Sequence, residues 1–278
     1  MNIRILGTAA AEGWPALFCN CSACSAAREA GGKNLRTRSS LQINDDLKID
    51  LPPDTLFHSH RSGQELSDLQ YLLITHSHSD HLAAEEIHNL VPPFAQQNKS
   101  NSIRIFGNDA SLEKIREAGR TGTLERPDLL NELYAFETLF IGHYEITTVK
   151  ARHKPSEECL NYLIRDTEED FSVLYTCDTG FYSEESWNFL SGKHADLVIT
   201  ECTGGLERLE YGSHMGFPNV LDFRNRSEQI AFTDSHTRWI LTHFSHTGGS
   251  LHDELEQAVA AEGFEVAWDG MEIHTQQH

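Results

Sequence analysis

The segment His76-Ser77-His78-Ser79-Asp80-His81 most constrains what this chain can fold into. It places four potential metal ligands within six residues, directly after the apolar run at residues 71–75, which predicts a buried strand. If the strand continues extended, His76 and His78 point the same way, while Asp80 and His81 can serve a second ion. Neutral imidazoles and a carboxylate suit Zn²⁺, Mn²⁺ or Fe²⁺. A polar loop with satisfied histidines is the alternative, and this density of ligand types disfavours it.

Three further candidate ligands follow predicted strands farther along the chain. They are His153, Asp178 and His243, which come after the apolar stretches at residues 144–150, 172–177 and 239–242. Each one alone is more typical of a capping or core residue. Together with the first cluster they complete the set of about seven ligands, including a bridging carboxylate, that a two-metal site requires. The sequence therefore predicts a dinuclear metal centre.

Three of the six cysteines, Cys19, Cys21 and Cys24, form a C-x-C-x₂-C cluster. They are too close in sequence to bridge one another well, whereas three thiolates suit Zn²⁺ and leave one tetrahedral position for a fourth ligand. His246, three residues after His243, is the candidate. A buried group of free thiols is the alternative. The remaining cysteines lie in or near apolar stretches and are expected to be inert buried thiols: Cys159, Cys177 and Cys202.

Charge and hydropathy limit the cellular compartments and the binding partners that are expected for this chain. The chain carries 22 Lys and Arg against 42 Asp and Glu, a formal net charge of −20. Such an acidic surface disfavours nucleic acid and anionic membranes, but bound divalent metals still permit a small anionic substrate. No apolar run reaches the length that spans a bilayer, and the N-terminus lacks the apolar region of a signal peptide. These features predict a cytoplasmic protein.

Hairpins and strand–helix units alternate along the chain, which predicts an α+β fold with a mixed sheet system covered by helices. Strands are expected at residues 3–6, 39–43, 47–50, 71–75, 103–106, 144–150, 160–165, 172–177, 196–200, 239–242 and 264–268. Helices are expected at residues 82–87, 110–118, 184–190 and 251–261, and a surface loop at residues 120–131. No linker rich in Pro, Gly or Ser divides the chain, so one domain spanning residues 1–278 is expected.

The order of these motifs resembles the metallo-β-lactamase superfamily across the whole chain. The resemblance implies a single-domain, four-layer αββα sandwich with both metals at one edge, between the sheets. It also implies that the first ion is held by His76, His78 and His153, the second by Asp80, His81 and His243, and that Asp178 bridges the two.

Within that superfamily, the cysteine cluster and residues 241–246 and 264–273 look like those of the PhnP-like branch, phosphoribosyl 1,2-cyclic phosphate phosphodiesterases of phosphonate metabolism. This implies a structural Zn²⁺ held by Cys19, Cys21, Cys24 and His246, and a phosphodiesterase that uses metal-bound hydroxide. Asp80 would also orient that hydroxide, His214 on its Gly-flanked loop would be the general acid, and Asp50 would support the metal ligands from behind. The chain departs from the family pattern after Asp50 and at Asn161, which is expected near the substrate mouth.

Other activities stay open from the sequence. A tRNA 3′-processing nuclease shares the metal ligands, although the negative charge and the lack of a basic exosite segment argue against it. The ligand set does not exclude lactonases or thioesterases of the superfamily. An accessory protein resembling the PQQ-pathway B protein has a similar cysteine cluster, but the complete dinuclear ligand set favours an enzyme. The expected partner is a small phosphodiester substrate, and a homodimer stays open.

Overall fold

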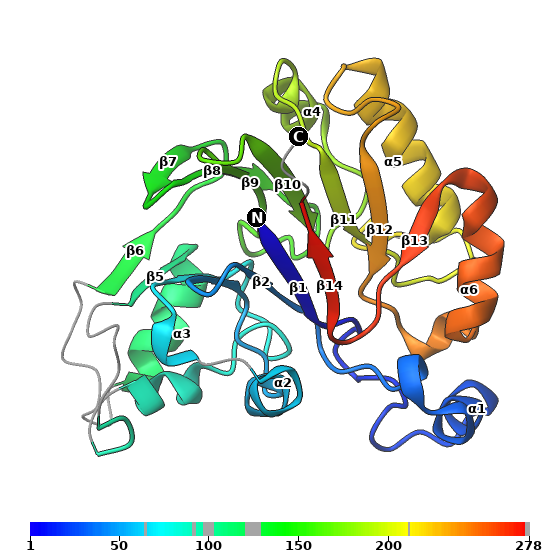
Figure 1. Ribbon diagram of the computed structural model, residues 1–278, viewed down its shortest axis with the longest axis horizontal. Coiled ribbons are helices and arrows are strands. Elements are labelled where there is room, and N and C mark those ends of the chain that lie inside the picture. The colour runs from blue at the N-terminus through cyan, green and yellow to red at the C-terminus, as the bar shows by residue number, and fades with distance from the viewer. Residues whose placement is uncertain (64–65, 91–92, 97–102, 120–128, 211, 276–278) are drawn as a thin grey trace.

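A computed structural model describes residues 1–63, 66–90, 93–96, 103–119, 129–210 and 212–275. Over these residues, two mixed sheets pack face to face and helices cover their outer sides (Figure 1). This is the predicted four-layer αββα sandwich. None of the helices in these ranges is long and apolar enough to cross a membrane.

Each sheet contains seven strands among the described residues, partly antiparallel and partly parallel. The order in the first sheet is β14 (Met271–His274), β1 (Asn2–Gly7), β2 (Ser40–Ile43), β3 (Leu47–Ile49), β4 (Tyr71–Leu73), β5 (Arg104–Gly107) and β6 (Leu130–Glu132). The order in the second is β13 (Phe264–Val266), β12 (Arg238–Thr242), β11 (Leu197–Glu201), β10 (Phe171–Thr176), β9 (Leu160–Asp166), β8 (Tyr144–Lys150) and β7 (Thr138–Ile141).

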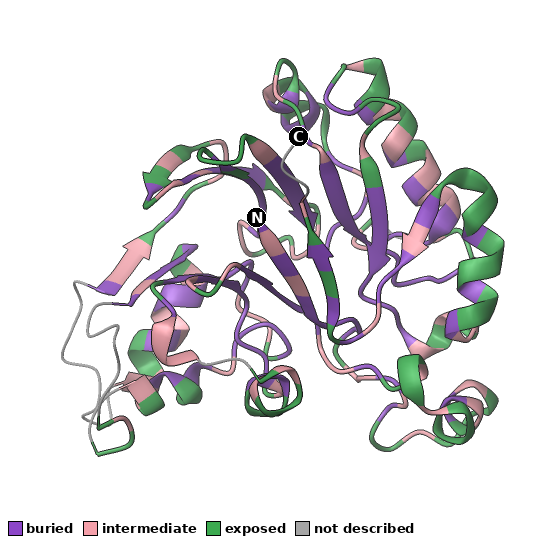
Figure 2. Ribbon diagram, viewed as in Figure 1, coloured by how far each residue is buried: buried purple, intermediate pink, exposed green. Residues whose placement is uncertain are grey.

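Three apolar clusters occupy the three interfaces between the layers. The first lies between the sheets and joins side chains such as Ile49 of β3 and Ile199 of β11. The second packs the other face of the second sheet against α4 (Glu184–Leu190), α5 (Phe217–Gln229) and α6 (His252–Val259). The third packs the first sheet against α3 (Asp109–Gly119), and α2 (Thr55–Ser62) contacts β1 of the same sheet. Figure 2 shows the consequence: the strands are largely buried and the outer helix faces are exposed.

Strand direction brings the polar segments to one edge. β3 and β4 run parallel, as do β10, β11 and β12, and β8 shares their direction because two antiparallel pairings separate it from β10. Parallel strands deliver the residues that follow them to the same edge of the sheet. The candidate ligands follow the ends of β8, β10 and β12 in the second sheet and of β4 in the first, and contacts with Asp178 show that these four ends meet.

Several sequence-based element boundaries are wrong. The helix expected at residues 82–87 is a 3₁₀ helix, η3 (Ala84–Leu90), because Leu82 instead forms a bridge to Leu51 and its neighbour Ala83 donates to the Leu51 carbonyl. The expected loop at residues 120–131 ends in β6, and its residues 120–128 lie outside the described ranges. The prediction also missed α1 (Ser22–Ala30), α2, α5, β7 and β14.

Candidate metal centres

Asp178 lies at the focus of the predicted ligands. Its Oδ2 is 3.3 Å from Nε2 of His76, 3.2 Å from Nε2 of His81 and 3.4 Å from Nε2 of His153. Its Oδ1 is 2.7 Å from Nε2 of His243. One carboxylate therefore faces imidazoles of both predicted ion sites, which is the geometry required of a bridging ligand.

The donor atoms fall into two groups that share Asp178. The first contains His76, His78, His153 and Asp178, whose ligand atoms lie within 4.8 Å of one another. The second contains His81, His243 and Asp178 under the same limit. Asp80 joins the second group, because its Oδ2 lies 3.2 Å from Nε2 of His81. The two groups match the two predicted ligand sets.

Cys177, which the sequence predicts to be an inert buried thiol, lies beside the second group of candidate ligands. Its Sγ belongs to the second group of close donor atoms, beside His81, Asp178 and His243. Burial raises the pKa of this thiol well above its usual range, so the uncharged form predominates. The interpretation of Cys177 as a buried thiol holds, but its position is next to the site.

The side chains fit divalent cations, and the observation that decides this is a set of unsatisfied buried atoms. Nε2 of His76, His81 and His243 and Oδ1 of Asp178 are buried and have no hydrogen-bond partner among the described residues. Leaving such groups unpaired is costly, and native proteins rarely do so. A metal ion between them would satisfy these lone pairs. Imidazole and carboxylate donors suit Zn²⁺, Mn²⁺ and Fe²⁺.

Hydrogen bonds fix the tautomers that ligation needs. Nδ1 of His81 donates to Oδ2 of Asp50 at 2.6 Å, and Nδ1 of His153 faces the Ser213 carbonyl at 3.3 Å. Nδ1 of His243 lies 2.9 Å from Oγ1 of Thr203. In each ring the proton on Nδ1 leaves the lone pair on Nε2, which points toward Asp178.

The electrostatics of the site also favour positive charge at its centre. Burial and the neighbouring His81 lower the pKa of His76 to about 4, so its imidazole is neutral and can ligate. Although burial lowers it, the carboxylates of Asp178, Asp50 and Asp80 raise the pKa of His81 well above its usual range. Burial would raise the pKa of Asp178, yet the imidazoles of His243 and His81 hold it well below its usual range. The negative charge of three carboxylates around one imidazole is the charge that a bound cation would neutralise.

Backbone strain marks the same residues. Asp50, Asp178 and His243 have φ values of 63°, 54° and 57°, in the left-handed region that residues with a Cβ rarely adopt. Such strain persists only where the surroundings over-determine the conformation, and it clusters at functional sites. The positive φ of Asp50 coincides with the departure from the family pattern that follows it.

Asp50 lies behind the candidate site. It is fully buried, and besides His81 it accepts hydrogen bonds from the backbone N and Oγ1 of Thr75 at 2.8 and 3.0 Å. Thr75 Oγ1 in turn lies 3.0 Å from Nδ1 of His76. One carboxylate therefore orients two candidate ligands.

We expect Asp50→Ala to weaken binding of the active-site metals by about 10–100-fold, because outer partners of metal-binding histidines typically contribute that much. Metal retained per chain under a graded chelator series measures it. The exposed Asp45→Ala is the control, and an unchanged chelator midpoint in Asp50→Ala would show that His81 needs no such partner.

Asn161, which the sequence places near the substrate mouth as an expectation, lies at the start of β9 next to the segment that carries Asp178. Its side chain is fully buried, and Nδ2 donates to the Cys177 carbonyl at 2.8 Å. Oδ1 accepts from the Tyr182 hydroxyl at 2.8 Å. The amide therefore ties β9 to the residue before Asp178.

His214 reaches the site from the loop between β11 and α5. Its ring stacks on His243 at a centroid distance of 5.8 Å and meets the edge of His153 at 4.8 Å. Its loop can approach because of Gly180: a Cβ there would lie 1.9 Å from the Gly212 carbonyl oxygen. From the sequence, only the family resemblance points to His214.

Glu201, at the end of β11, is the residue that the sequence reading missed. It is fully buried, and its Oε1 lies 3.0 Å from Nδ1 of His214. Its Oε2 accepts from Thr203 Oγ1 at 2.6 Å, which joins it to His243. Although burial lowers it, the Glu201 carboxylate raises the pKa of His214 to about 9. Its position just after a buried strand was the available signal.

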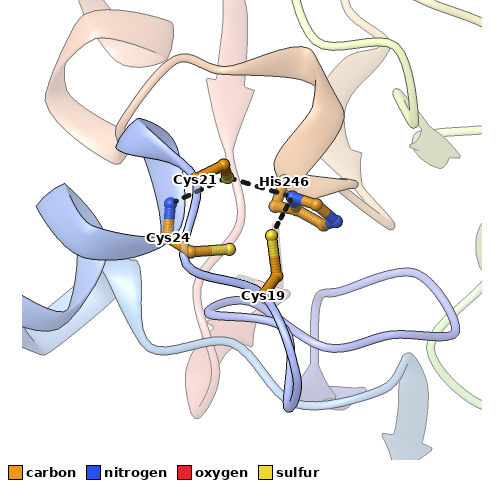
Figure 3. Close-up of side chains that lie close together, drawn as sticks. All are labelled: Cys19, Cys21, Cys24 and His246. Carbon is orange, nitrogen blue, oxygen red and sulfur yellow. Dashed lines mark hydrogen bonds between the residues drawn. The ribbon is translucent and has the colours of Figure 1, made fainter.

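The cysteine cluster and His246 meet beside α1 (Figure 3). Ligand atoms of Cys19, Cys21, Cys24 and His246 lie within 4.8 Å of one another. Nδ1 of His246 is 3.5 Å from Sγ of Cys21 and 3.9 Å from Sγ of Cys19. Tetrahedral zinc with these ligands separates them by about 3.5–3.8 Å, so the four side chains fit that ion.

The thiols of this cluster differ in acidity. Hydrogen bonds from the Cys24 backbone and from His246 lower the pKa of Cys21 to about 6, which favours a thiolate. Burial raises the pKa of Cys24 to about 11. On the far side of the imidazole, Nε2 of His246 lies 3.8 Å from Oε1 of Glu12.

The four layers and the donor arrangement define a protein of the β-lactamase superfamily. The family model described as the beta-lactamase superfamily domain matches residues 49–244, so the chain belongs to that family. This confirms the superfamily predicted from the motifs. No curated protein sequence matches the chain.

Solved structures share the fold at low identity. A new diphosphatase from the PhnP family is 19% identical, with a TM-score of 0.74 over 99% of this chain and 98% of its own. Zn²⁺-bound PqqB from Methylobacterium extorquens is 18% identical, with a TM-score of 0.74 over 99% of this chain and 100% of its own. The short form of human tRNase Z is 16% identical, with a TM-score of 0.66 over 99% and 100%. At these identities the likeness shows the fold alone.

Proposed function

We propose that this chain is a metal-dependent phosphodiesterase that hydrolyses a small, cyclic ribose phosphodiester in the manner of PhnP-like enzymes. The observation that supports it most is the Asp178 carboxylate, which lies 3.2–3.4 Å from three imidazole Nε2 atoms and 2.7 Å from a fourth. His214 and Glu201 stand next to this centre. A dinuclear ligand set with an adjacent proton donor fits hydrolysis of an ester with a poor leaving group.

The chain's own residues divide the work. When bound, the two divalent ions would supply Lewis acidity and a nucleophile at neutral pH. The first subsite would be formed by His76, His78 and His153, and the second by Asp80, His81 and His243, with Asp178 shared. Asp80, which is only 10% exposed, would also orient the attacking water, and Asp50 and Thr203 hold their histidines in position. His214, protonated through Glu201, would give its proton to the departing alkoxide oxygen.

Charge supports a small substrate over nucleic acid. The formal net charge is −20, whereas binding of RNA depends on a basic surface that faces the phosphates. The comparison with a PhnP-family diphosphatase adds to the case for phosphoester chemistry. We further propose a cytoplasmic location. The zinc of the cysteine site would have a structural role.

A hydrolysis panel tests the proposal. Purified protein loaded with Zn²⁺ or Mn²⁺ is assayed against bis-p-nitrophenyl phosphate, a 2′,3′-cyclic nucleotide, a ribose cyclic phosphate, a lactone and a thioester. We expect turnover of the phosphodiesters and the highest kcat/KM for the ribose cyclic phosphate. A preference for the lactone or the thioester would contradict the proposal.

Metal counting separates the enzyme from a non-enzymatic accessory protein. Seven donors at the dinuclear centre and four at the cysteine site predict about three ions per chain. Mass spectrometry of the native protein measures the number. A single ion per chain would fit the accessory protein instead, and would remove the basis for hydrolysis.

We expect His214→Ala to retain its metals and to lose about 10²–10⁴ in kcat on substrates with alkoxide leaving groups, the usual contribution of a general acid. p-Nitrophenolate leaves without a proton, so bis-p-nitrophenyl phosphate should be affected much less. The ratio of the two rate losses is the measurement. Equal rates of mutant and wild type on both substrates would rule out the acid role.

A further inference from the structure

Ser77, between the candidate ligands His76 and His78, is held by a carboxylate from another loop. Its backbone N donates to Oε1 of Glu157 at 2.7 Å, and its Oγ donates to Oε2 at 2.6 Å. Glu157 lies on the segment between β8 and β9, which also carries His153. A single side chain thus joins the two segments that supply the three histidines of the first subsite.

Two further donors complete the environment of Glu157. Nδ2 of Asn108, just after β5, donates to Oε1 at 2.9 Å, and Nζ of Lys154 donates to Oε2 at 2.8 Å. The side chain of Glu157 is only 2% exposed, although it is charged. Burial would raise its pKa, but hydrogen bonds from Lys154, Ser77 and Asn108 lower it to about 2. A buried carboxylate that accepts hydrogen bonds from four donors is held in one position, unlike a solvated surface charge.

The opposite side of the Ser77 peptide is held as well. Nζ of Lys114, on α3, donates to the Ser77 carbonyl at 2.8 Å and to the Leu82 carbonyl at 3.0 Å. Residues 75–81 have no regular secondary structure. Their conformation therefore depends on side chains that satisfy the backbone from outside, and Ser77 receives two such contacts.

The contacts of Glu157 bear on the candidate ligands His78 and His153, which lie on the two segments that it joins. Nδ1 of His78 lies 3.1 Å from Nε2 of His153, and the two ring centroids are 4.9 Å apart. These two histidines come from segments that share no strand pairing; a backbone bond from Leu160 N to the Thr75 carbonyl at 2.9 Å joins the ends of the segments, and the contacts of Glu157 join them next to the histidines. Lys154, adjacent to His153, is bound to both Ser77 Oγ at 3.1 Å and Glu157.

We propose that Glu157 is a positioning residue for the first metal subsite: it locks the His76–His78 segment to the His153 segment, so that the three imidazoles face one divalent cation. It contacts no candidate ligand side chain itself and acts through Ser77 and Lys154. The inference rests on the proposed metal-dependent function, since it assigns the first ion to these histidines.

The test uses metal-loaded protein and a graded series of a competing chelator, with the ions retained per chain counted by mass spectrometry. In Glu157→Ala we expect one of the two active-site metal ions to be lost at a chelator concentration about 10–100-fold lower than in the wild type. This is the usual loss of metal affinity when a residue that supports the ligands is removed. The other metal ions, including the ion of the cysteine site, should be released at the same chelator concentrations as in the wild type.

Glu158→Ala is the matched control. Glu158 is the next residue, its side chain is 38% exposed, and its Oε1 accepts from the Ala135 backbone instead of from the ligand loops. Its midpoints should equal those of the wild type. Glu157→Gln, which keeps an acceptor oxygen for Ser77 N but loses the charge that holds Lys154, should fall between wild type and Glu157→Ala; it carries the test if Glu157→Ala is insoluble.

Unchanged midpoints in both Glu157 variants would overturn the inference. A shift of every equivalent together, with an equal loss of melting temperature, would also overturn it, because it would indicate general destabilisation. The readout needs no substrate, so failure of wild-type protein to hydrolyse any phosphodiester would count against the proposed function and leave this result intact.

Discussion

Asp178→Ala is expected to release both active-site ions and to lower hydrolysis by at least about 10³-fold, because the two-metal centre is what brings the pKa of water from about 15.7 toward about 7. The physical reason is its central position. Oδ2 faces imidazoles of both subsites, and Oδ1 faces His243. Every other ligand serves one ion, so this substitution should have the largest effect of any single change.

Metal analysis and kcat/KM on the phosphodiester panel measure the effect. Asp222→Ala, an exposed carboxylate on α5 that pairs with Arg208, is the control and should retain wild-type metal content and rate. The far-ultraviolet circular dichroism of Asp178→Ala, compared with metal-stripped wild type, shows whether the fold persists. An Asp178→Ala protein that still holds two ions besides that of the cysteine site would contradict the bridging role.

The candidate ligands could be singled out from the sequence because each one carries a local signal. A buried strand followed by His or Asp is visible in the sequence at residues 71–81, and weaker forms of it recur before His153, Asp178 and His243. Parallel strand direction brings the segments after β10 and β12 to one edge of the second sheet, and the packing of the two sheets places His76 beside them, 3.3 Å from Asp178. The superfamily resemblance supplied the pairing of ligands with ions, which spacing alone left open.

The supporting residues were not predictable in this way. Glu157 is a single acid with no periodic or motif signal, and Glu201 carries only the weak signal of its position after an expected strand; both roles follow from which loops the fold brings against these residues. The misassigned helix after His81 has a similar cause. Its residues favour a helix locally, but the pairing of Leu82 with Leu51 keeps the backbone extended there. Tertiary contacts, not propensity, decide such positions.

The helix α5 is a different kind of omission, because its start was visible. Gly216 precedes Phe217 and Pro218, and Pro in the first turn of a helix is a common initiation signal. In the family-like stretch at residues 264–273 the sequence predicts one strand, at residues 264–268, whereas the structure has a second one there, β14.

Cys21→Ala is expected to lose one zinc per chain, to melt at a lower temperature and to hydrolyse substrate more slowly. Zinc would be the direct link between α1 and the 3₁₀ helix η5 (His246–Gly248), which carries the fourth ligand. Structural zinc contributes its binding free energy to folding. Each kcal/mol lost should lower Tm by about 2–4 °C in a chain of this size.

The reduction in activity follows from continuity of the backbone. His246 lies three residues after His243, whose strained φ of 57° and hydrogen bond to Thr203 aim it at Asp178. If the zinc site opens, the His246 end of this segment loses its anchor, and the position of His243 loosens with it. The second active-site ion should then bind more weakly, although no residue of its own subsite has changed.

Cys21→Ser separates this effect from the loss of a helix cap. Sγ of Cys21 accepts a hydrogen bond from Cys24 N at the start of α1, and serine is a preferred residue at that position. The serine variant therefore keeps the cap while replacing a thiolate with a poor zinc ligand. If both variants lose zinc, melt lower and turn over more slowly, the metal is responsible. If only Cys21→Ala melts lower, the cap accounts for the stability. If Cys21→Ala keeps wild-type activity and melting temperature, the cysteine cluster has no structural role.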